Sequence, residues 1–392
     1  MPELSWVITL ALMVGVLIYV QYQWPIFGSK KQKNISKDYF RGLNYLLNEQ
    51  TDKAIEVFTR MLEVEKETVE IHLALGNLFR RRGEVDRSIR IHQNLIKDAG
   101  LNKEQREKAL LELANDYLRA GLLDRAETLL NDLVESQTRT PEALTLLNDI
   151  YQQEKDWRKA AATARQLEKA SGEKKNDIIA HYYCEMAQLS RDEGDRKKAE
   201  HNLREALRID PSCVRAVLVL GQLLIQDRNY QQAIEILKKV KDQDPSYLGE
   251  SVDMIQQCYA ALDQPHKMLD YLREILPLYP STHIVLMIAQ MLREQQGRDA
   301  AKAFVLEQLQ VKPTIRGLDW LLDMQLQGPV LERGEQQQAI EELKTLTRKM
   351  LEDHPKYRCL RCGFIGGKLH WHCPSCKSWN SVKPIIAKQG NE

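Results

Sequence analysis

The sequence predicts an all-α protein of helical repeats, with an apolar helix before the repeats and a small metal-binding domain after them. Three observations support this fold class. Small residues recur at an interval of 34, an uncharged apolar run stands near the N-terminus, and four cysteines form two C-x-x-C pairs near the C-terminus. The 392 residues carry a formal net charge of +1, which gives no general attraction to nucleic acid.

The 34-residue interval separates Gly42 from Gly76 and Ala187 from Gly221. Such a period, with small residues at fixed offsets, is typical of tetratricopeptide (TPR) repeats, each a helix–turn–helix unit. A small residue lets the two helices of a unit approach closely where they cross. We therefore expect a TPR superhelix of about eight units over residues 35–314, closed by a capping helix pair over 315–354.

In the fourth expected unit, Asn148 stands where the other units have a small residue. The helix pair of this unit is therefore expected to cross less tightly than the others. His72, His92, His181, His201 and His283 are isolated within helical pattern, and we interpret each as a packing or surface residue.

The concave face of a TPR array is an extended groove for peptides or proteins. Polar residues of the first helices that packing does not use are the candidates for contact with a partner: Asn44, Asn48, Asn77, Arg80, Arg81, Asn115 and Arg119. The run Arg80-Arg81-Arg82 suits a carboxylate or an acidic helix, although such a run is more often only a solvated face. The array contains no phosphate-binding glycine loop, nucleophile elbow or His-x-x-x-His pair, so we expect a binding protein and not an enzyme.

Residues 4–20 carry no charge and are long enough, as a helix, to span a hydrocarbon core about 30 Å thick. Trp6 stands at one end of the run and Tyr19, Tyr22 and Trp24 stand at the other, as aromatic residues do at membrane interfaces. A cleaved signal peptide is the alternative, but no Lys or Arg precedes the run and no small-x-small site follows it. The sequence predicts a single transmembrane anchor over 1–24.

Basic residues follow the apolar run, in the linker 25–34 and just beyond it: Lys30, Lys31, Lys33, Lys37 and Arg41. The positive-inside rule then places the N-terminus outside and the repeats in the cytoplasm. Cysteine usage agrees, because Cys184, Cys213 and Cys258 are scattered singly, which suits a reducing compartment better than a disulfide framework.

Within residues 355–384, two C-x-x-C turns bring together four thiols: Cys359, Cys362, Cys373 and Cys376. Four thiolates at this spacing make a tetrahedral site for one zinc or iron ion, and the sequence leaves the choice of metal open. Two separate redox pairs are the alternative, but the βαβ context of such motifs is missing. Residues 385–392 are expected to form a short tail.

Other residues of this segment suit the same interpretation. Gly363 fits a left-handed turn after the second thiol, and Phe364, Trp371 and Trp379 are expected to supply a miniature core. His370 and His372 flank the site and are expected to be outer-shell or surface groups.

The order of anchor, TPR array and four-cysteine knuckles resembles the lipopolysaccharide assembly protein B family of Gram-negative bacteria, over essentially the whole chain. The knuckles alone resemble rubredoxin and zinc ribbons equally. The metal-ligand positions of the family fall on the four cysteines. Lys377 departs from the symmetric pattern, because the second knuckle often has glycine there.

The resemblance implies an inner-membrane adaptor that promotes proteolysis of LpxC, the deacetylase that commits precursor to lipid A, by the membrane-anchored protease FtsH. It also implies contacts with other lipopolysaccharide synthesis and transport proteins. Two other functions stay open: a general scaffold for envelope assembly with no effect on protein turnover, and a redox protein using iron. Nucleic-acid binding through the basic knuckles lacks a reading helix.

Overall fold

The computed structural model describes residues 40–385, except 43, 46, 47, 49, 65–68, 98–99, 138, 328–333 and 352–355. The anchor and basic linker predicted over residues 1–34 lie outside this part of the chain. Among the helices that are described, none is both long and apolar enough to cross a bilayer. The chain divides into two compact units, Met1–Arg139 (unit 1) and Thr140–Glu392 (unit 2).

Unit 1 consists of antiparallel helices that pack on their neighbours in sequence. The described helices are α3 (Thr51–Val64), α4 (Val69–Arg82), α5 (Val85–Lys97), α6 (Lys103–Arg119) and α7 (Leu123–Glu135). Helix α6 begins with a capping box, in which Asn102 Oδ1 accepts from the Gln105 backbone N–H and the Gln105 side chain accepts in return. This cap satisfies backbone N–H groups that have no partner within the helix.

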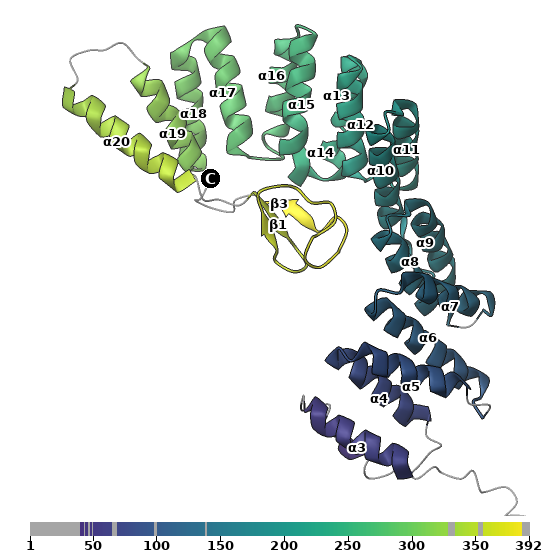
Figure 1. Ribbon diagram of the computed structural model, residues 1–392. Coiled ribbons are helices and arrows are strands. Elements are labelled where there is room, and N and C mark those ends of the chain that lie inside the picture. The colour runs from purple at the N-terminus through teal and green to yellow at the C-terminus, as the bar shows by residue number, and fades with distance from the viewer. Residues whose placement is uncertain are drawn as a thin grey trace, which may run out of the picture. The chain divides into compact units, whose positions relative to one another are not determined.

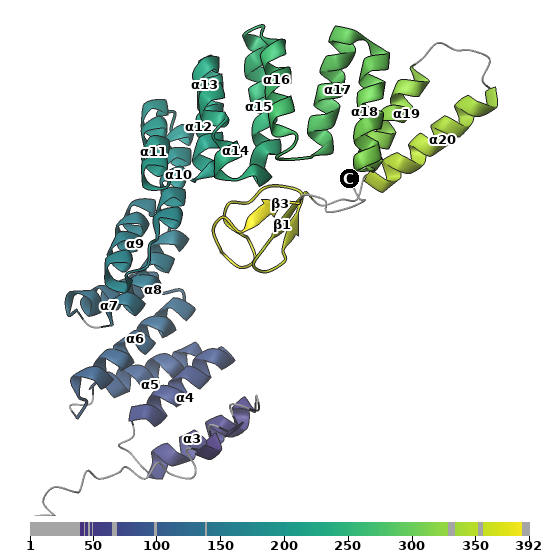
Figure 2. The same ribbon diagram turned by 180° about the vertical axis from the view of Figure 1, so that it is seen from behind.

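Unit 2 continues the helix–turn–helix pattern and ends in a small sheet (Figures 1 and 2). Its helices are α8 (Thr140–Gln153), α9 (Trp157–Ser171), α10 (Asn176–Asp192), α11 (Arg196–Ile209), α12 (Val214–Gln226), α13 (Tyr230–Leu237), α14 (Val240–Gln243), the 3₁₀ turn η2 (Pro245–Tyr247), α15 (Leu248–Ala261), α16 (Pro265–Ile275), α17 (Thr282–Gln296), α18 (Arg298–Val311), α19 (Ile315–Leu326) and α20 (Gly334–Leu351). The prediction of helical repeats is confirmed.

The small residues of the period mark the helix crossings. A Cβ atom added to Gly76 would lie less than 3.0 Å from the His92 ring, and one added to Gly221 would lie less than 3.0 Å from Leu237. In both pairs the larger residue follows the glycine by 16 positions. The period therefore records a repeated contact between a small residue of one helix and a large residue of the next.

Asn148, which replaces the small residue in α8, is buried and hydrogen-bonded to each of the next two helices. Its Nδ2 donates to the Ala160 carbonyl of α9 at 2.8 Å, and its Oδ1 accepts from the Tyr182 hydroxyl of α10 at 2.6 Å. A buried amide costs stability only when its hydrogen bonds are missing. Here the polar substitute links three successive helices.

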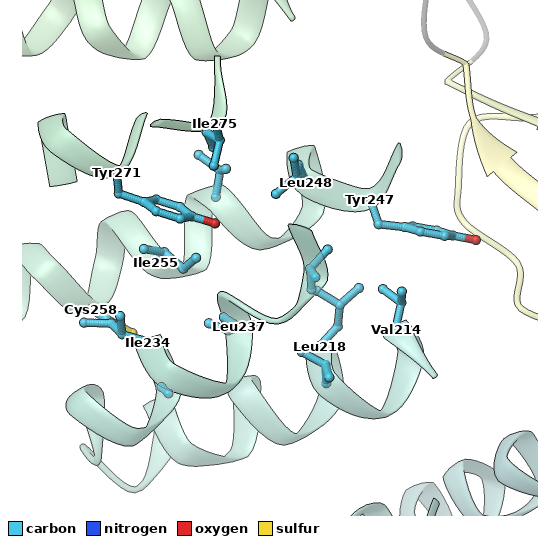
Figure 3. Packing of buried hydrophobic residues seen from close by; sticks show 14 of the residues in the cluster. Val214, Leu218, Ile234, Leu237, Tyr247, Leu248, Ile255, Cys258, Tyr271 and Ile275 are labelled. Carbon is cyan, nitrogen blue, oxygen red and sulfur yellow. The ribbon is translucent and has the colours of Figure 1, made fainter. Parts of the chain in front are cut away.

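The main core of unit 2 is apolar and continuous across repeats (Figure 3). Leu237, Ile255 and Ile275 are fully buried in it, and Tyr247 lies at one end with its hydroxyl directed toward the terminal sheet. The three scattered cysteines are buried in the same cluster as free thiols. They fill space in the core as small apolar groups.

Candidate metal centre and its contact with the repeats

The C-terminal sheet has the strand order β2-β1-β3, all antiparallel, with β1 (Tyr357–Cys359), β2 (Ile365–Gly366) and β3 (Val382–Pro384). The first C-x-x-C turn connects β1 to β2. Its Gly363 has φ +76° and donates its N–H to the Cys359 carbonyl at 3.0 Å. The turn thereby directs two thiols to the same side of the sheet.

The second knuckle repeats this geometry without glycine. Lys377 adopts φ +56° and donates its N–H to the Cys373 carbonyl at 3.0 Å. Its own carbonyl lies 2.7 Å from His372 Nε2, and this contact helps to hold the left-handed turn. The departure noted in the sequence therefore leaves the turn intact, although a left-handed lysine is strained relative to glycine.

The four cysteine sulfurs converge, and all lie within 4.8 Å of one another. Sγ of Cys359 is 3.8 Å from Sγ of Cys376, and Sγ of Cys362 is 3.7 Å from Sγ of Cys373. A tetrahedral ion with metal–sulfur bonds of about 2.3 Å requires sulfur–sulfur distances of about 3.8 Å. The donor set and its spacing therefore fit one zinc or iron ion, and they do not distinguish between the two metals.

Serine hydroxyls lie beside two of the sulfurs. Ser381 Oγ is 3.4 Å from Cys359 Sγ, and Ser378 Oγ is 3.4 Å from Cys376 Sγ. Hydrogen bonding with the Ser381 hydroxyl lowers the pKa of Cys359 to about 6, and Ser378 lowers the pKa of Cys376 in the same way. Burial has the opposite effect on Cys373, whose pKa rises to about 11. A bound cation favours the thiolate form of all four.

Trp371 and Trp379 were predicted to form a miniature core inside the metal-binding domain, and this prediction is wrong. The Trp379 ring stacks on His181 of α10 with ring centroids 5.2 Å apart, and its Nε1 donates to Gln152 Oε1 of α8 at 2.9 Å. Trp371 stacks on Tyr247 at 5.2 Å. A domain this small has little interior, so its largest side chains bury themselves against the repeats instead.

Inside the domain the apolar contacts are made by smaller groups. Val382 is fully buried with Cys359 and Cys373, and Phe364 packs at the edge of this cluster. Of the three aromatic residues expected in the miniature core, Phe364 alone belongs to it.

Polar contacts surround the aromatic contact. Lys383 Nζ pairs with Asp244 Oδ2 at 2.8 Å and lies 4.7 Å from the centroid of the Tyr247 ring. The Tyr247 hydroxyl donates to the Val382 carbonyl at 3.2 Å, and the Tyr357 hydroxyl donates to Glu250 Oε1 at 2.5 Å. Because these bonds come from both β1 and β3, they fix the orientation of the sheet against η2 and α15.

His181 is buried between the two tryptophan rings. Burial, reinforced by the nearby Arg215, lowers the pKa of His181 to about 3, so the imidazole is neutral at neutral pH. A neutral ring stacks on Trp379 without the cost of burying a charge. His372 stacks on the same indole with ring centroids 4.4 Å apart, and burial lowers its pKa as well.

The residues predicted to face a protein-binding groove all lie in unit 1. Arg80 pairs with Glu112 at 2.6 Å and with Asp116 at 2.8 Å, so its charge is already balanced within the unit. Arg82 pairs with Asp52 and Glu84. The other predicted residues are exposed or half-buried: Asn44, Asn48, Asn77, Arg81, Asn115 and Arg119.

Sequence reasoning missed the receiving surface for the metal-binding domain, which consists of Gln152, Trp157, His181, Tyr182, Asp244, Tyr247 and Glu250. These residues come from three different repeats and carry no periodic signal. The available clue was the presence of two tryptophans in a domain too small to bury them.

Fold and site together define a TPR protein whose C-terminal rubredoxin-type domain is packed against its own repeats. The model of the rubredoxin metal binding domain matches residues 357–384, and tetratricopeptide repeat models match residues 71–107, 111–174 and 190–249. Lipopolysaccharide assembly protein B of Escherichia coli K12 is 36% identical, with 94% of this chain and 96% of that protein covered. The protein of the same name from Haemophilus influenzae is 37% identical, with 91% of each chain covered. The chain belongs to the lipopolysaccharide assembly protein B family.

Proposed function

We propose that this chain is an inner-membrane adaptor of lipopolysaccharide assembly that promotes degradation of the deacetylase LpxC by the protease FtsH. The observation that carries the proposal is similarity over nearly the full length to lipopolysaccharide assembly protein B, including both the repeats and the metal-binding domain. Helical repeats without a catalytic constellation suit a protein that holds other proteins together.

In this proposal the two units have different roles. Unit 2 receives the metal-binding domain on its helices, whereas the candidate partner-binding residues lie in unit 1, where Arg81 and Arg119 are exposed. Exposed guanidinium groups bind carboxylates in a forked geometry, so an acidic segment of a client or of the protease suits this surface.

The metal site forms the second part of the proposal. Cys359, Cys362, Cys373 and Cys376 hold one zinc or iron ion, which supplies the cross-link that the small sheet needs. Because Trp371 and Trp379 come from the same domain, loss of the ion also loosens the contact with the repeats. The ion acts here as a structural group.

The anchor forms the third part. Residues 1–24 span the inner membrane with the N-terminus in the periplasm, and both the repeats and the metal-binding domain lie in the cytoplasm. A tether confines the adaptor to the surface on which the membrane protease also lies, which raises their effective concentration without new contacts. Deletion of these residues is expected to leave a soluble protein with low activity.

The test is the half-life of LpxC in cells depleted of this protein, with FtsH either active or inactivated. We expect depletion to lengthen the half-life only while FtsH is active. The wild-type chain should restore rapid turnover, and the Cys373→Ser variant should not. A chain with Val311→Ser, a change at an exposed site on α18, serves as the matched control.

An unchanged LpxC half-life on depletion would contradict the adaptor function. It would favour a scaffold that gathers envelope-assembly proteins without affecting their turnover, a function that the repeats and the name of the relatives also support.

A further inference from the structure

Helix α20 packs on α19 through a polar face. Lys344 pairs with Asp323, and the Thr347 hydroxyl donates to Asp319 Oδ1 at 2.7 Å, while the half-buried Ile340 lies on the same side of α20. Residues 340, 344 and 347 follow the spacing i, i+4, i+7, which is one face of a helix. The described part of the contact between α19 and α20 therefore includes an ion pair and a hydrogen bond.

The apolar face of α20 is exposed. Leu343, Leu346 and Met350 are 51%, 56% and 55% exposed, and Ala339 is exposed one turn before them. Their spacing of i, i+4, i+7, i+11 is that of the a and d positions of a coiled coil. We call these four residues the α20 stripe. By helical spacing the stripe lies beside the face that contacts α19. Helix α20 itself lies at the end of the array (Figure 1).

We propose that the α20 stripe binds the same stripe of a second copy of this chain, in an antiparallel two-helix pairing. The pattern is self-complementary in size. A two-fold axis between Leu343 and Leu346 places each of these leucines opposite the other in the second copy, and it places the small Ala339 opposite the large Met350. An antiparallel coiled coil pairs a with d positions in this way.

The charged residues next to the α20 stripe also favour a second copy of this chain as its partner. Glu342 and Lys349 directly precede Leu343 and Met350, so they flank the stripe on the edge away from α19. In the antiparallel pairing Glu342 of each copy faces Lys349 of the other, which gives two ion pairs, each between a carboxylate and an ammonium group. The positions on the other edge, Ile340 and Thr347, are occupied by the contact with α19.

The size of the stripe sets the expected strength. Four apolar side chains on each copy bury well under about 1,200 Å², which is the range of weak and transient associations. The dimer is therefore expected to dissociate in the micromolar range, with monomers present at low concentration.

Sedimentation equilibrium of the full chain in detergent, over a range of concentrations, tests the pairing. We expect a monomer–dimer equilibrium that Leu343→Glu weakens at least about tenfold. The control Val311→Glu places the same charge at another exposed apolar site, 82% exposed, and should leave association unchanged. Circular dichroism of both variants verifies that the helices remain folded.

A charge exchange identifies the orientation and the occupant. Glu342→Lys and Lys349→Glu should each weaken dimerisation about threefold, whereas the double variant should restore it to the wild-type value. Association through any other segment would not show this recovery. A monomer at all concentrations, a dimer insensitive to Leu343→Glu, or a double variant as weak as the single ones would each overturn the proposal.

Discussion

In unit 1, Gly76 of one helix lies against His92 of the next, whereas in unit 2 the equivalent Gly221 lies against Leu237. Leu237 belongs to a continuous apolar core. His92 instead belongs to a buried polar network, with its Nδ1 2.5 Å from Asp116 Oδ2, and Asp116 also accepts from the Ser88 hydroxyl at 2.6 Å. The same crossing thus accommodates two kinds of chemistry.

The difference shows what the repeat requires. Each helix crossing needs a small residue on one helix and a large side chain on the other. The large side chain can be polar when its hydrogen-bonding groups have partners. Unit 1 gains specific hydrogen bonds in this way, while unit 2 gains an apolar core that supports the receiving surface for the metal-binding domain. The two units should therefore respond to different perturbations.

The largest effect is expected in unit 2, from Cys359→Ser. With three thiolates the metal-binding domain loses its cross-link, because a domain of this size cannot fold on burial alone. The metal-to-protein ratio, measured by elemental analysis, should fall from about one to near zero, and proteolysis should remove the segment after α20. A fully metallated, protease-resistant variant would contradict the proposed ligand set.

The polar network of unit 1 is the next test. Asp116→Ala removes the buried carboxylate that contacts His92 and takes from Arg80 one of its two carboxylate partners, at a cost of about 3 kcal/mol. Hydrogen exchange in α4–α6 should accelerate strongly, with the helices of unit 2 unaffected. Glu112→Ala removes a more exposed partner of Arg80 and should have a smaller effect. Equal effects of the two substitutions would argue against a special role for the buried carboxylate.

Substitution of glycine by alanine at two sites distinguishes the effect of close helix contact on stability from the effect of helix propensity. Gly221→Ala forces a Cβ into Leu237 and should destabilise unit 2 by about 2 kcal/mol. Gly249→Ala, in α15, meets only the Tyr279 hydroxyl at 3.7 Å, so alanine should stabilise that helix by up to about 1 kcal/mol. Chemical denaturation of the two variants measures this difference, and effects of the same sign would contradict the crossing geometry.

The smallest expected effect is a pH dependence of the contact between the metal-binding domain and α10. His181 has a pKa of about 3 in the folded protein and about 6.5 when unfolded. The unfolded state binds the extra proton below pH 6.5, so this contribution to stability is complete at neutral pH and decreases as pH falls. The loss should reach about 1.4 kcal/mol between pH 7.5 and 5.5.

Denaturation of the wild-type chain and of His181→Gln at both pH values measures this loss. The metal centre contributes its own pH dependence to both chains, so the difference between them isolates His181. If the two chains lose the same stability on acidification, the histidine is not buried as a neutral ring.

The sequence was sufficient for the features that depend on local pattern. The 34-residue period records a contact between adjacent helices, and the C-x-x-C spacing records a turn that aims two thiols at one point, so both could be predicted. The contact of Trp379 with Gln152 joins residues 227 positions apart, and no periodicity encodes it. Lys377 shows a different limit, because the surrounding fold imposes a left-handed turn that its residue type does not favour.

The central claim is that the metal ion, through its small domain, stabilises the receiving surface of unit 2 and leaves unit 1 independent. Hydrogen exchange of the full chain, with the metal bound and after its removal by a chelator, tests this claim most directly. Metal removal should accelerate exchange in α10, η2 and the first turn of α15, with no change in α4–α6. Unchanged exchange in α10 and η2, or a uniform acceleration in both units, would contradict the account.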